Sequence, residues 1–230
     1  MKPPQISVII PVFNHEQELH CCLATLKNQT LKDFEVIVVD DGSASPVVLP
    51  DFVSDFEYPV MVVRQENGGA PSARNRGFDE SIGNYVIFSD ADILWEADAL
   101  EKMYDVLVKK SDVDVVYSSF YFGWKKFLCG EYTREKLEQH NIFHTSSMMR
   151  RENFSRFDES LRRFQDWDLW LTMTKSGAKP YWIPEFLFRV TPHKGGMSQF
   201  IPSFLYWFPF LPAVAAYRAA ERIIRIKHAI

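Results

Sequence analysis

Short apolar segments alternate with helical patterns in the first 110 residues, and this alternation is the feature that most constrains the fold. Between and after the segments, apolar residues recur every three or four positions, as they do on amphipathic helices. Strand–helix–strand connections of this length favour right-handed crossovers and parallel pairing. The sequence therefore predicts an α/β fold with a Rossmann-like half and a mostly parallel sheet. Its expected strands are Ile6–Ile10, Phe34–Val39, Val60–Val63 and Tyr85–Phe88.

Two of the expected strands end in pairs of acids. Asp40 and Asp41 follow the second strand, and Asp90 and Asp92 follow the fourth. A buried carboxylate without a partner is costly, so such acids need a cation or hydrogen-bond donors. In open α/β sheets the carboxyl ends of the strands face the ligand crevice. An Asp-x-Asp pair there suits a hard divalent ion that also contacts phosphate, and the alternative is a polar loop that caps the next helix.

Polar and turn-forming residues mark the expected helix boundaries. Asn14 is a candidate N-cap for a helix reaching about Gln29, with Gln17 in a capping-box position. Pro71 suits the first position of a helix that ends near Ile82. Gly83 after that helix, and Gly177 after a helix over 166–176, suit the left-handed conformation that often ends helices. These signals predict compact connections between the strands.

Composition narrows the function classes. The chain has 230 residues and a net charge of −4 without a long basic run, which argues against a nucleic-acid partner. The glycine-rich dinucleotide fingerprint is missing after the first strand, which argues against NAD and FAD. Three cysteines form no disulfide framework, and no apolar run reaches the length of a membrane span. We therefore expect a cytosolic enzyme or binding protein.

The pattern changes after the first half. We divide the chain into a nucleotide-binding half over 1–110, an acceptor-binding half of the same domain over 111–200, and a tail over 201–230. Residues 118–164 are aromatic and basic with little periodicity, and a strand is expected near 180–189. The tail combines aromatic residues with a basic amphipathic segment, a pattern typical of helices that lie on anionic membranes. The alternatives are a helix docked on its own domain and a dimer contact.

Five motifs in order resemble those of the family-two glycosyltransferases, which have the GT-A fold and use nucleotide-sugar donors. The resemblance covers roughly residues 5 to 198. Each motif alone is weak, but their order and separations are specific. The motifs are Ser7-Val-Ile-Ile-Pro-Val-Phe-Asn14, Val38-Val-Asp-Asp-Gly-Ser43, Asn67-Gly-Gly-Ala-Pro-Ser-Ala-Arg-Asn-Arg-Gly77, Ser89-Asp-Ala-Asp92 and Asp166-Trp-Asp-Leu-Trp170.

The resemblance implies a donor site with a divalent ion, Mg²⁺ or Mn²⁺. Asp92 and Asp90 would hold the ion together with His193 from a loop near the donor, and Asp90 alternatively contacts ribose. Asp41 would hydrogen-bond the base, and Arg74, near a helix start, suits the diphosphate. The further residues implied for nucleotide-sugar binding are Pro11, Val12, Phe13, Glu16, Asn67, Gly68 and Ala91.

The resemblance also implies the catalytic base. Asp166 would accept a proton from the acceptor hydroxyl as that oxygen attacks the sugar opposite the diphosphate, which inverts the anomeric configuration. Gln165 stands where the family often has Glu, and Asp168 is the reserve candidate for the base. His144, with Ser146 and Ser147, occupies the place of acceptor-side residues in the family.

The expected function is transfer of a sugar from a nucleoside-diphosphate sugar, first of all a UDP-sugar, to a saccharide or lipid-linked saccharide. Two alternatives remain open. One is a nucleotide-sugar-binding protein without turnover, against which the intact Asp90, Asp92 and Asp166 argue. The other is a nucleotidyltransferase of similar fold, but Pro11-Val-Phe-Asn14 stands where such enzymes carry a glycine-rich basic loop.

Overall fold

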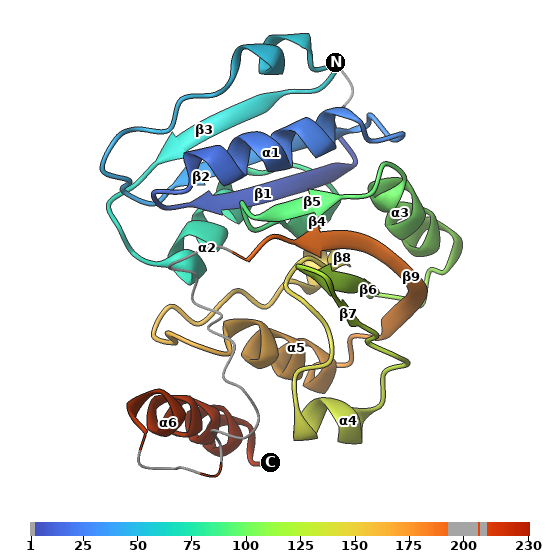
Figure 1. Ribbon diagram of the computed structural model, residues 1–230. Helices are drawn as coiled ribbons and strands as arrows, with labels where there is room; N and C mark the ends of the chain where they lie inside the picture. Colours follow the sequence, from blue (N-terminus) through green and yellow to red (C-terminus); the bar gives the residue numbers. More distant parts are fainter. Residues whose placement is uncertain (1–2, 193–206, 208–210) are drawn as a thin grey trace.

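A single nine-stranded sheet runs through the molecule, with helices on both of its faces (Figure 1). The computed structural model describes residues 3–192, 207 and 211–230. The strand order is β3-β2-β1-β4-β8-β6-β9-β5, and β7 pairs with β6 at the side of this path. The sheet is therefore continuous across the two halves expected from the sequence.

The first half is a parallel sheet, as predicted. Neighbouring strands of the series β3-β2-β1-β4 all pair in parallel. Val12 at the end of β1 lies opposite Asp40 at the end of β2, so the polar residues after these strands gather at one edge. The bounds are β1 Ile6–Val12, β2 Phe34–Asp40, β3 Val60–Arg64 and β4 Tyr85–Phe88.

Two apolar cores form on opposite faces of the sheet because side chains alternate along each strand. On β1, Val8 and Ile10 join the core beneath α1 and α3, whereas Ile9 joins the core beneath α2 and α5. Trp167 and Trp170 of α5 are buried in the second core. The helix bounds are α1 Glu16–Lys27, α2 Ala70–Glu80, α3 Ala99–Lys109 and α5 Gln165–Lys175.

The second half adds strands that mostly pair antiparallel, although β6 and β9 pair in parallel. The sequence predicted β9 but missed the other strands. Three of them, β5, β7 and β8, are three residues long and too short for a periodic signal. The bounds are β5 Ile93–Trp95, β6 Val115–Phe122, β7 Lys125–Phe127, β8 Met148–Arg150 and β9 Pro180–Val190. The other short elements are α4 Arg134–Gln139 and the 3₁₀ turns η1 Asp51–Asp55 and η2 Arg151–Asn153.

Two predicted helix boundaries are wrong. His15, not Asn14, occupies the N-cap of α1, because Asn14 is left-handed (φ 58°) and its side chain accepts a hydrogen bond from the Ala44 amide. Gly83 is not left-handed, and it is needed for close approach instead. A Cβ there would lie 2.7 Å from the backbone of Ile6 and Ser7. Gly177, in contrast, follows α5 with φ 102°, as predicted.

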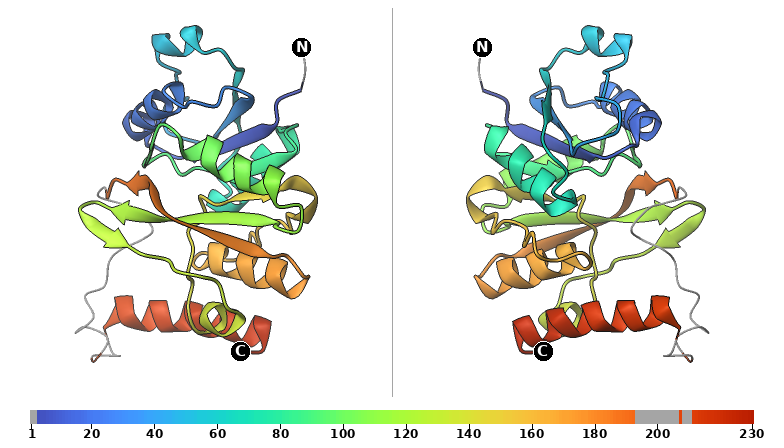
Figure 2. Two further views of the ribbon diagram at one scale, coloured as in Figure 1. Left: turned by 90° about the vertical axis from the view of Figure 1, so that its right-hand side faces the viewer. Right: turned by 90° about the vertical axis from the view of Figure 1, so that its left-hand side faces the viewer.

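The C-terminal helix α6, Pro212–His228, docks on its own domain beside α4 and α5, at the end of the molecule opposite β3 (Figures 1 and 2). Its His228 Nε2 lies 2.7 Å from the buried Asp168 Oδ1, and Lys227 lies 2.9 Å from the other oxygen. Arg225 lies over the Trp167 ring at 5.4 Å. In the parts of the chain that the structure describes, no helix is long and apolar enough to cross a bilayer.

Candidate active site

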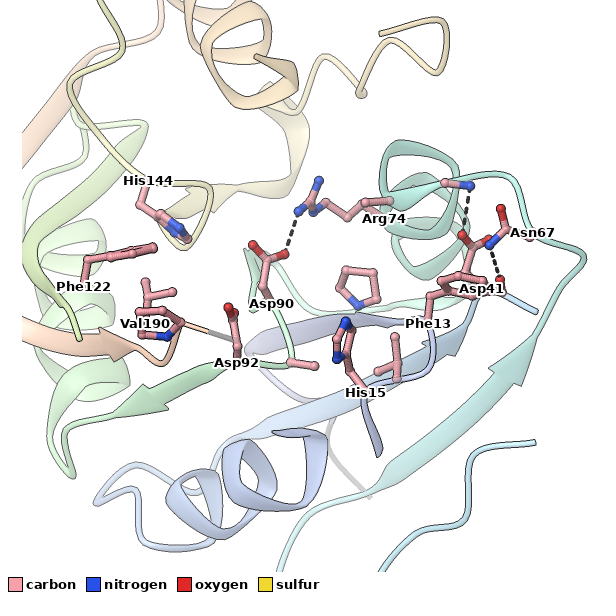
Figure 3. A pocket seen from close by; sticks show the side chains of 16 residues that line it. Phe13, His15, Asp41, Asn67, Arg74, Asp90, Asp92, Phe122, His144 and Val190 are labelled. Carbon is pink, nitrogen blue, oxygen red and sulfur yellow. Dashed lines mark hydrogen bonds and ion pairs between the residues drawn. The ribbon is translucent and has the colours of Figure 1, made fainter. Parts of the chain in front are cut away.

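A cavity of about 370 Å³ lies at the carboxyl ends of the parallel strands, where the sequence predicted the donor site (Figure 3). We call it the first cavity. Acids that follow β2 and β4 face it together with the segment that follows β1. Its lining residues are Pro11, Val12, Phe13, His15, Asp41, Asn67, Gly69, Ala70, Arg74, Asp90, Ala91, Asp92, Phe122, His144, Val190 and Pro192.

A second cavity, of about 390 Å³, adjoins the first. It lies between β6, β7, the start of α5 and α6, and four residues line both cavities: Arg74, Asp90, Phe122 and His144. A ligand in one cavity therefore meets a ligand in the other across these four side chains. The residues that line the second cavity alone are Phe120, Phe127, Asn141, Thr145, Arg162, Arg163, Phe164, Gln165, Asp166 and Tyr217.

Arg74 is the central cation of the shared wall. Its buried guanidinium donates to Asp90 at 2.6 Å and to Gln165 Oε1 at 3.3 Å, and it lies over the Phe157 ring. Burial alone would raise the pKa of Asp90, but the charge and the hydrogen bond of Arg74 lower it. Arg74 Nε is buried without a hydrogen-bond partner among the described residues. Asp90 is thus held as a carboxylate, and the Nε–H group of Arg74 could donate a hydrogen bond to a ligand.

Asp41 organises the turn that closes one side of the first cavity. Its Oδ1 accepts from the Gly68 amide at 2.9 Å and from Gln65 at 2.8 Å, and its Oδ2 accepts from the Gly69 amide at 2.8 Å. Gly69 has φ 87°, a conformation that favours glycine. Asn67 donates to the Asp41 carbonyl (Figure 3). The carboxylate therefore fixes the position of this turn.

Asp92 lies beside Asp90 in the first cavity (Figure 3). The Asp92 carbonyl accepts from the amide and the hydroxyl of Thr191, which ties the end of β9 to this loop. Among the described residues, no three His, Cys, Asp or Glu side chains gather as a complete metal site. Two carboxylates suit Mg²⁺ or Mn²⁺ when substrate phosphates and water complete the coordination. The predicted third ligand, His193, lies outside the described residues.

His144 is a neutral imidazole at the junction of the cavities. Its Nδ1 accepts from the Ser146 amide at 3.1 Å, so Nε2 carries the proton of the neutral ring. The ring packs against Phe120 and Phe188. Burial lowers the pKa of His144, and the acids Asp90 and Asp166 offset this only in part. At neutral pH the residue can therefore donate a hydrogen bond without adding a charge.

Asp166 lines the second cavity at the start of α5. Its Oδ1 accepts from the Trp167 amide at 2.9 Å, and its Oδ2 accepts from Asn141 Nδ2 at 2.7 Å. Burial raises the pKa of Asp166, and the Trp167 amide and Arg74 counteract this only in part. A carboxylate with a raised pKa takes up a proton more readily, which suits a general base.

Most of the predicted site residues line the two cavities, but some do not. Glu16 and Gly68 are not among the lining residues, and the Glu16 carboxylate accepts from the Val48 amide instead. Asp168, the reserve candidate for the base, is hydrogen-bonded to Lys227 and His228 of α6. Sequence reasoning missed His15, Asn141, Arg162, Arg163 and Tyr217. His15 and the two arginines lie next to a motif, which could have served as a signal, but Asn141 and Tyr217 lie far from every motif.

Parallel strands with acids at their carboxyl ends, a curled mixed sheet and two adjoining cavities define an α/β protein of the GT-A fold. The profile of glycosyl transferase family 2 matches residues 7–170. The chain belongs to this family of enzymes, which confirms the predicted resemblance.

Relatives agree with this membership. The amylovoran biosynthesis glycosyltransferase AmsB of Erwinia amylovora is 31% identical over 203 residues, which cover 78% of this chain and 67% of AmsB. Glycosyltransferase GlyA of Streptococcus pneumoniae is 38% identical over 119 residues, which cover 51% of this chain and 17% of GlyA. The matched part of the chain thus spans less than a fifth of GlyA, so the similarity to GlyA concerns one segment of that protein.

Solved structures share the fold. Residues 1–349 of Staphylococcus aureus TarS, crystallised with UDP-GlcNAc, give a TM-score of 0.75 at 19% identity, with 96% of this chain and 66% of that chain covered. A mannosyltransferase of Pyrobaculum calidifontis, solved with GDP-Man and Mn²⁺, gives a TM-score of 0.64 at 22% identity, with 85% and 59% covered. These similarities confirm the predicted GT-A architecture.

Proposed function

We propose that this protein transfers a sugar from a nucleoside-diphosphate sugar, first of all a UDP-sugar, to a saccharide or lipid-linked saccharide, with inversion at the anomeric carbon. The donor occupies the first cavity and the acceptor occupies the second. Asp166 acts as general base, and Asp92 and Asp90 hold Mg²⁺ or Mn²⁺.

One observation carries the proposal: the two cavities meet at Arg74, Asp90, Phe122 and His144, with Asp92 in the first cavity and Asp166 in the second. A displacement reaction needs the leaving group and the attacking hydroxyl on opposite faces of one carbon. Two adjoining cavities with a shared wall offer this arrangement. A protein that only binds nucleotide sugars needs the first cavity but has no use for a partly buried base in the second.

On the donor side, the residues after β1 and the turn fixed by Asp41 would hold the nucleoside. Arg74 and the proton on His144 Nε2 would face the diphosphate and the transferred sugar. A divalent ion bound by Asp92 and Asp90 would stabilise the negative charge that develops on the leaving diphosphate. The nucleotide sugars bound by TarS and by the Pyrobaculum mannosyltransferase, and the Mn²⁺ of the latter, support this use of the fold.

On the acceptor side, Asp166 accepts the proton of the attacking hydroxyl. Asn141 and the Trp167 amide hold its carboxylate in a fixed orientation, so little reorganisation is needed during the reaction. Because Asp90 is neutralised by Arg74, Asp166 is the carboxylate of the second cavity that remains available as a base.

A donor screen followed by a turnover assay tests the proposal. UDP-, GDP-, dTDP- and CMP-sugars are compared by thermal shift with and without Mn²⁺, and the nucleotide released with acceptor saccharides is then measured. We expect a UDP-sugar to raise the melting temperature in a Mn²⁺-dependent manner and to be turned over. Stabilisation without nucleotide release by any acceptor would favour a binding protein, and no stabilisation by any nucleotide sugar would refute the proposal.

We further propose that the protein associates peripherally with anionic membranes, on their cytoplasmic face, through the outer side of α6. Ile223 and Ile226 are 54% and 70% exposed there, and Arg218 and Arg222 are exposed on the same helix. Apolar and basic residues together favour anionic interfaces. The variant with both isoleucines changed to serine leaves the docked side of α6 intact. It should float less with anionic vesicles than the wild type, and equal flotation would contradict this proposal.

A further inference from the structure

We propose that the second cavity selects an acceptor that carries an oxyanion, either a carboxylate on its sugar or the diphosphate of a lipid carrier, and that Arg162 and Arg163 bind this group. This inference rests on the proposed function and specifies the acceptor class. The two arginines precede α5 directly and line the same cavity as Asp166.

Neither arginine makes a hydrogen bond or an ion pair with any residue that the structure describes. The two acids that precede them in the chain are already engaged. Asp158 pairs with Lys227 at 2.6 Å, and Glu159 accepts from Asn75 at 2.8 Å. Two adjacent guanidinium groups that line a cavity without an internal counter-ion suit an anionic ligand, because arginine binds carboxylate and phosphate through paired hydrogen bonds.

The charge balance of the cavity points the same way. Its arginines and carboxylates are Arg74, Arg162, Arg163, Asp90 and Asp166. Arg74 and Asp90 neutralise each other through their ion pair, and His144 is neutral. Two arginines therefore face the single carboxylate of the base, which leaves a surplus of positive charge. Without them, an anionic acceptor would be repelled by the carboxylate that must deprotonate it.

The backbone beside the arginines is held in an unusual conformation. Phe164 is left-handed with φ 58°, which is uncommon for an aromatic residue and is found where tertiary contacts enforce it. Its ring packs edge-on against Tyr217 of α6 at 4.9 Å and against Trp167 at 5.8 Å. The docked α6 thus helps to fix the segment that carries Arg162 and Arg163 beside the start of α5.

Part of the cavity lining is apolar. Phe120 and Phe127 stack with centroids 5.1 Å apart and planes 5° apart. Flat aromatic surfaces of this kind accept the C–H face of a sugar ring or the first part of a lipid chain. The second cavity therefore combines an apolar wall, a base and two arginines, which fits a sugar with an attached anionic group better than a neutral glycan.

Equilibrium dialysis in the presence of UDP and Mn²⁺ tests this inference without turnover. The three probes are octyl β-glucoside, which is neutral, octyl β-glucuronide, which carries a carboxylate, and undecyl diphosphate-linked N-acetylglucosamine. Charge-assisted hydrogen bonds of this strength correspond to about a tenfold change in affinity or more. We expect at least one charged probe to bind about tenfold more tightly than the glucoside, and the charged probe that does so identifies the source of the oxyanion.

The double variant Arg162→Gln/Arg163→Gln should lose this preference while its affinity for UDP stays unchanged. The matched control Arg76→Gln removes an exposed arginine that pairs with Glu80 on α2, and it should behave as the wild type. Equal binding of all three probes, equal weakening of all three in the double variant, or no binding of either charged probe would overturn the inference. Failure of UDP itself to bind would instead overturn the proposed function.

Discussion

Replacement of Asp166 by Asn is the substitution that separates chemistry from structure most cleanly. Asn has the same shape as Asp, and its carbonyl can still accept from the Trp167 amide. In the wild type, the Asn141 amide nitrogen donates to Asp166 Oδ2, and the Asn141 side-chain oxygen is buried without a hydrogen-bond partner among the described residues. A flip of the Asn141 amide would therefore satisfy the new NH₂ group. The variant should fold normally.

The expected loss of activity follows from the role of the base. General-base catalysis contributes about 10²–10⁴-fold, so kcat in Asp166→Asn should fall by about that factor. Donor affinity should stay within a few-fold, because Asp166 lines the second cavity and not the first. Nucleotide release at saturating donor measures kcat, and calorimetry with UDP and Mn²⁺ measures affinity. Asp105→Asn, on the outer side of α3, is the matched control.

The pH dependence gives a second readout. Because burial raises the pKa of Asp166, kcat should rise with pH through a value above that of an ordinary aspartate, as the base becomes ionised. An acid with a raised pKa in the folded state destabilises the fold progressively as pH rises from its ordinary pKa to the raised one, and fully above it. Asp166→Asn should therefore melt at the same temperature as the wild type or higher at pH 7.5. A loss of less than tenfold in kcat, or a loss of UDP binding, would refute the reasoning.

Three further substitutions test other parts of the account. Asp92→Ala should abolish the effect of Mn²⁺ on UDP affinity in calorimetry, and a persistent Mn²⁺ effect would exclude Asp92 as a ligand. Arg74→Gln removes the cation proposed to face the diphosphate, so UDP affinity should fall at least about tenfold, and an unchanged affinity would contradict that role. The substitution also removes the ion pair with Asp90, so the free energy of unfolding measured in urea should fall by about 1–3 kcal/mol. Gly83→Ala places a Cβ 2.7 Å from the backbone at Ser7 and should lower the free energy of unfolding by about 1–3 kcal/mol. An unchanged free energy of unfolding would show that the backbone of β1 can shift to accommodate the added methyl group.

The sequence predicted the parallel half of the fold because each of its strands is a largely apolar run, from Ile6–Ile10 to Tyr85–Phe88. Predictions that depended on a single residue were less secure. Asn14 and Gly83 looked like local helix signals, but the first is held by the Ala44 amide and the second by the backbone of β1. Such contacts join residues far apart in the chain and leave no local pattern.

The two cavities also differ in how far the sequence could predict them. The first is built from motif residues at strand ends, and sequence reasoning identified most of them. The second brings together Asn141, Arg162 and Tyr217, which lie on three separate segments. Contacts between distant parts of the chain bring these segments together: Asn141 donates to Asp166, and Phe164 packs against Tyr217 of α6. The second cavity could therefore not be predicted from spacing alone.

The anomeric configuration of the first-formed product tests the central claim most directly. Attack from the second cavity on a sugar held in the first is a single displacement, so the ¹H NMR coupling constant of the new linkage should show inversion relative to the donor. Retention of the donor configuration would contradict direct transfer between the two cavities.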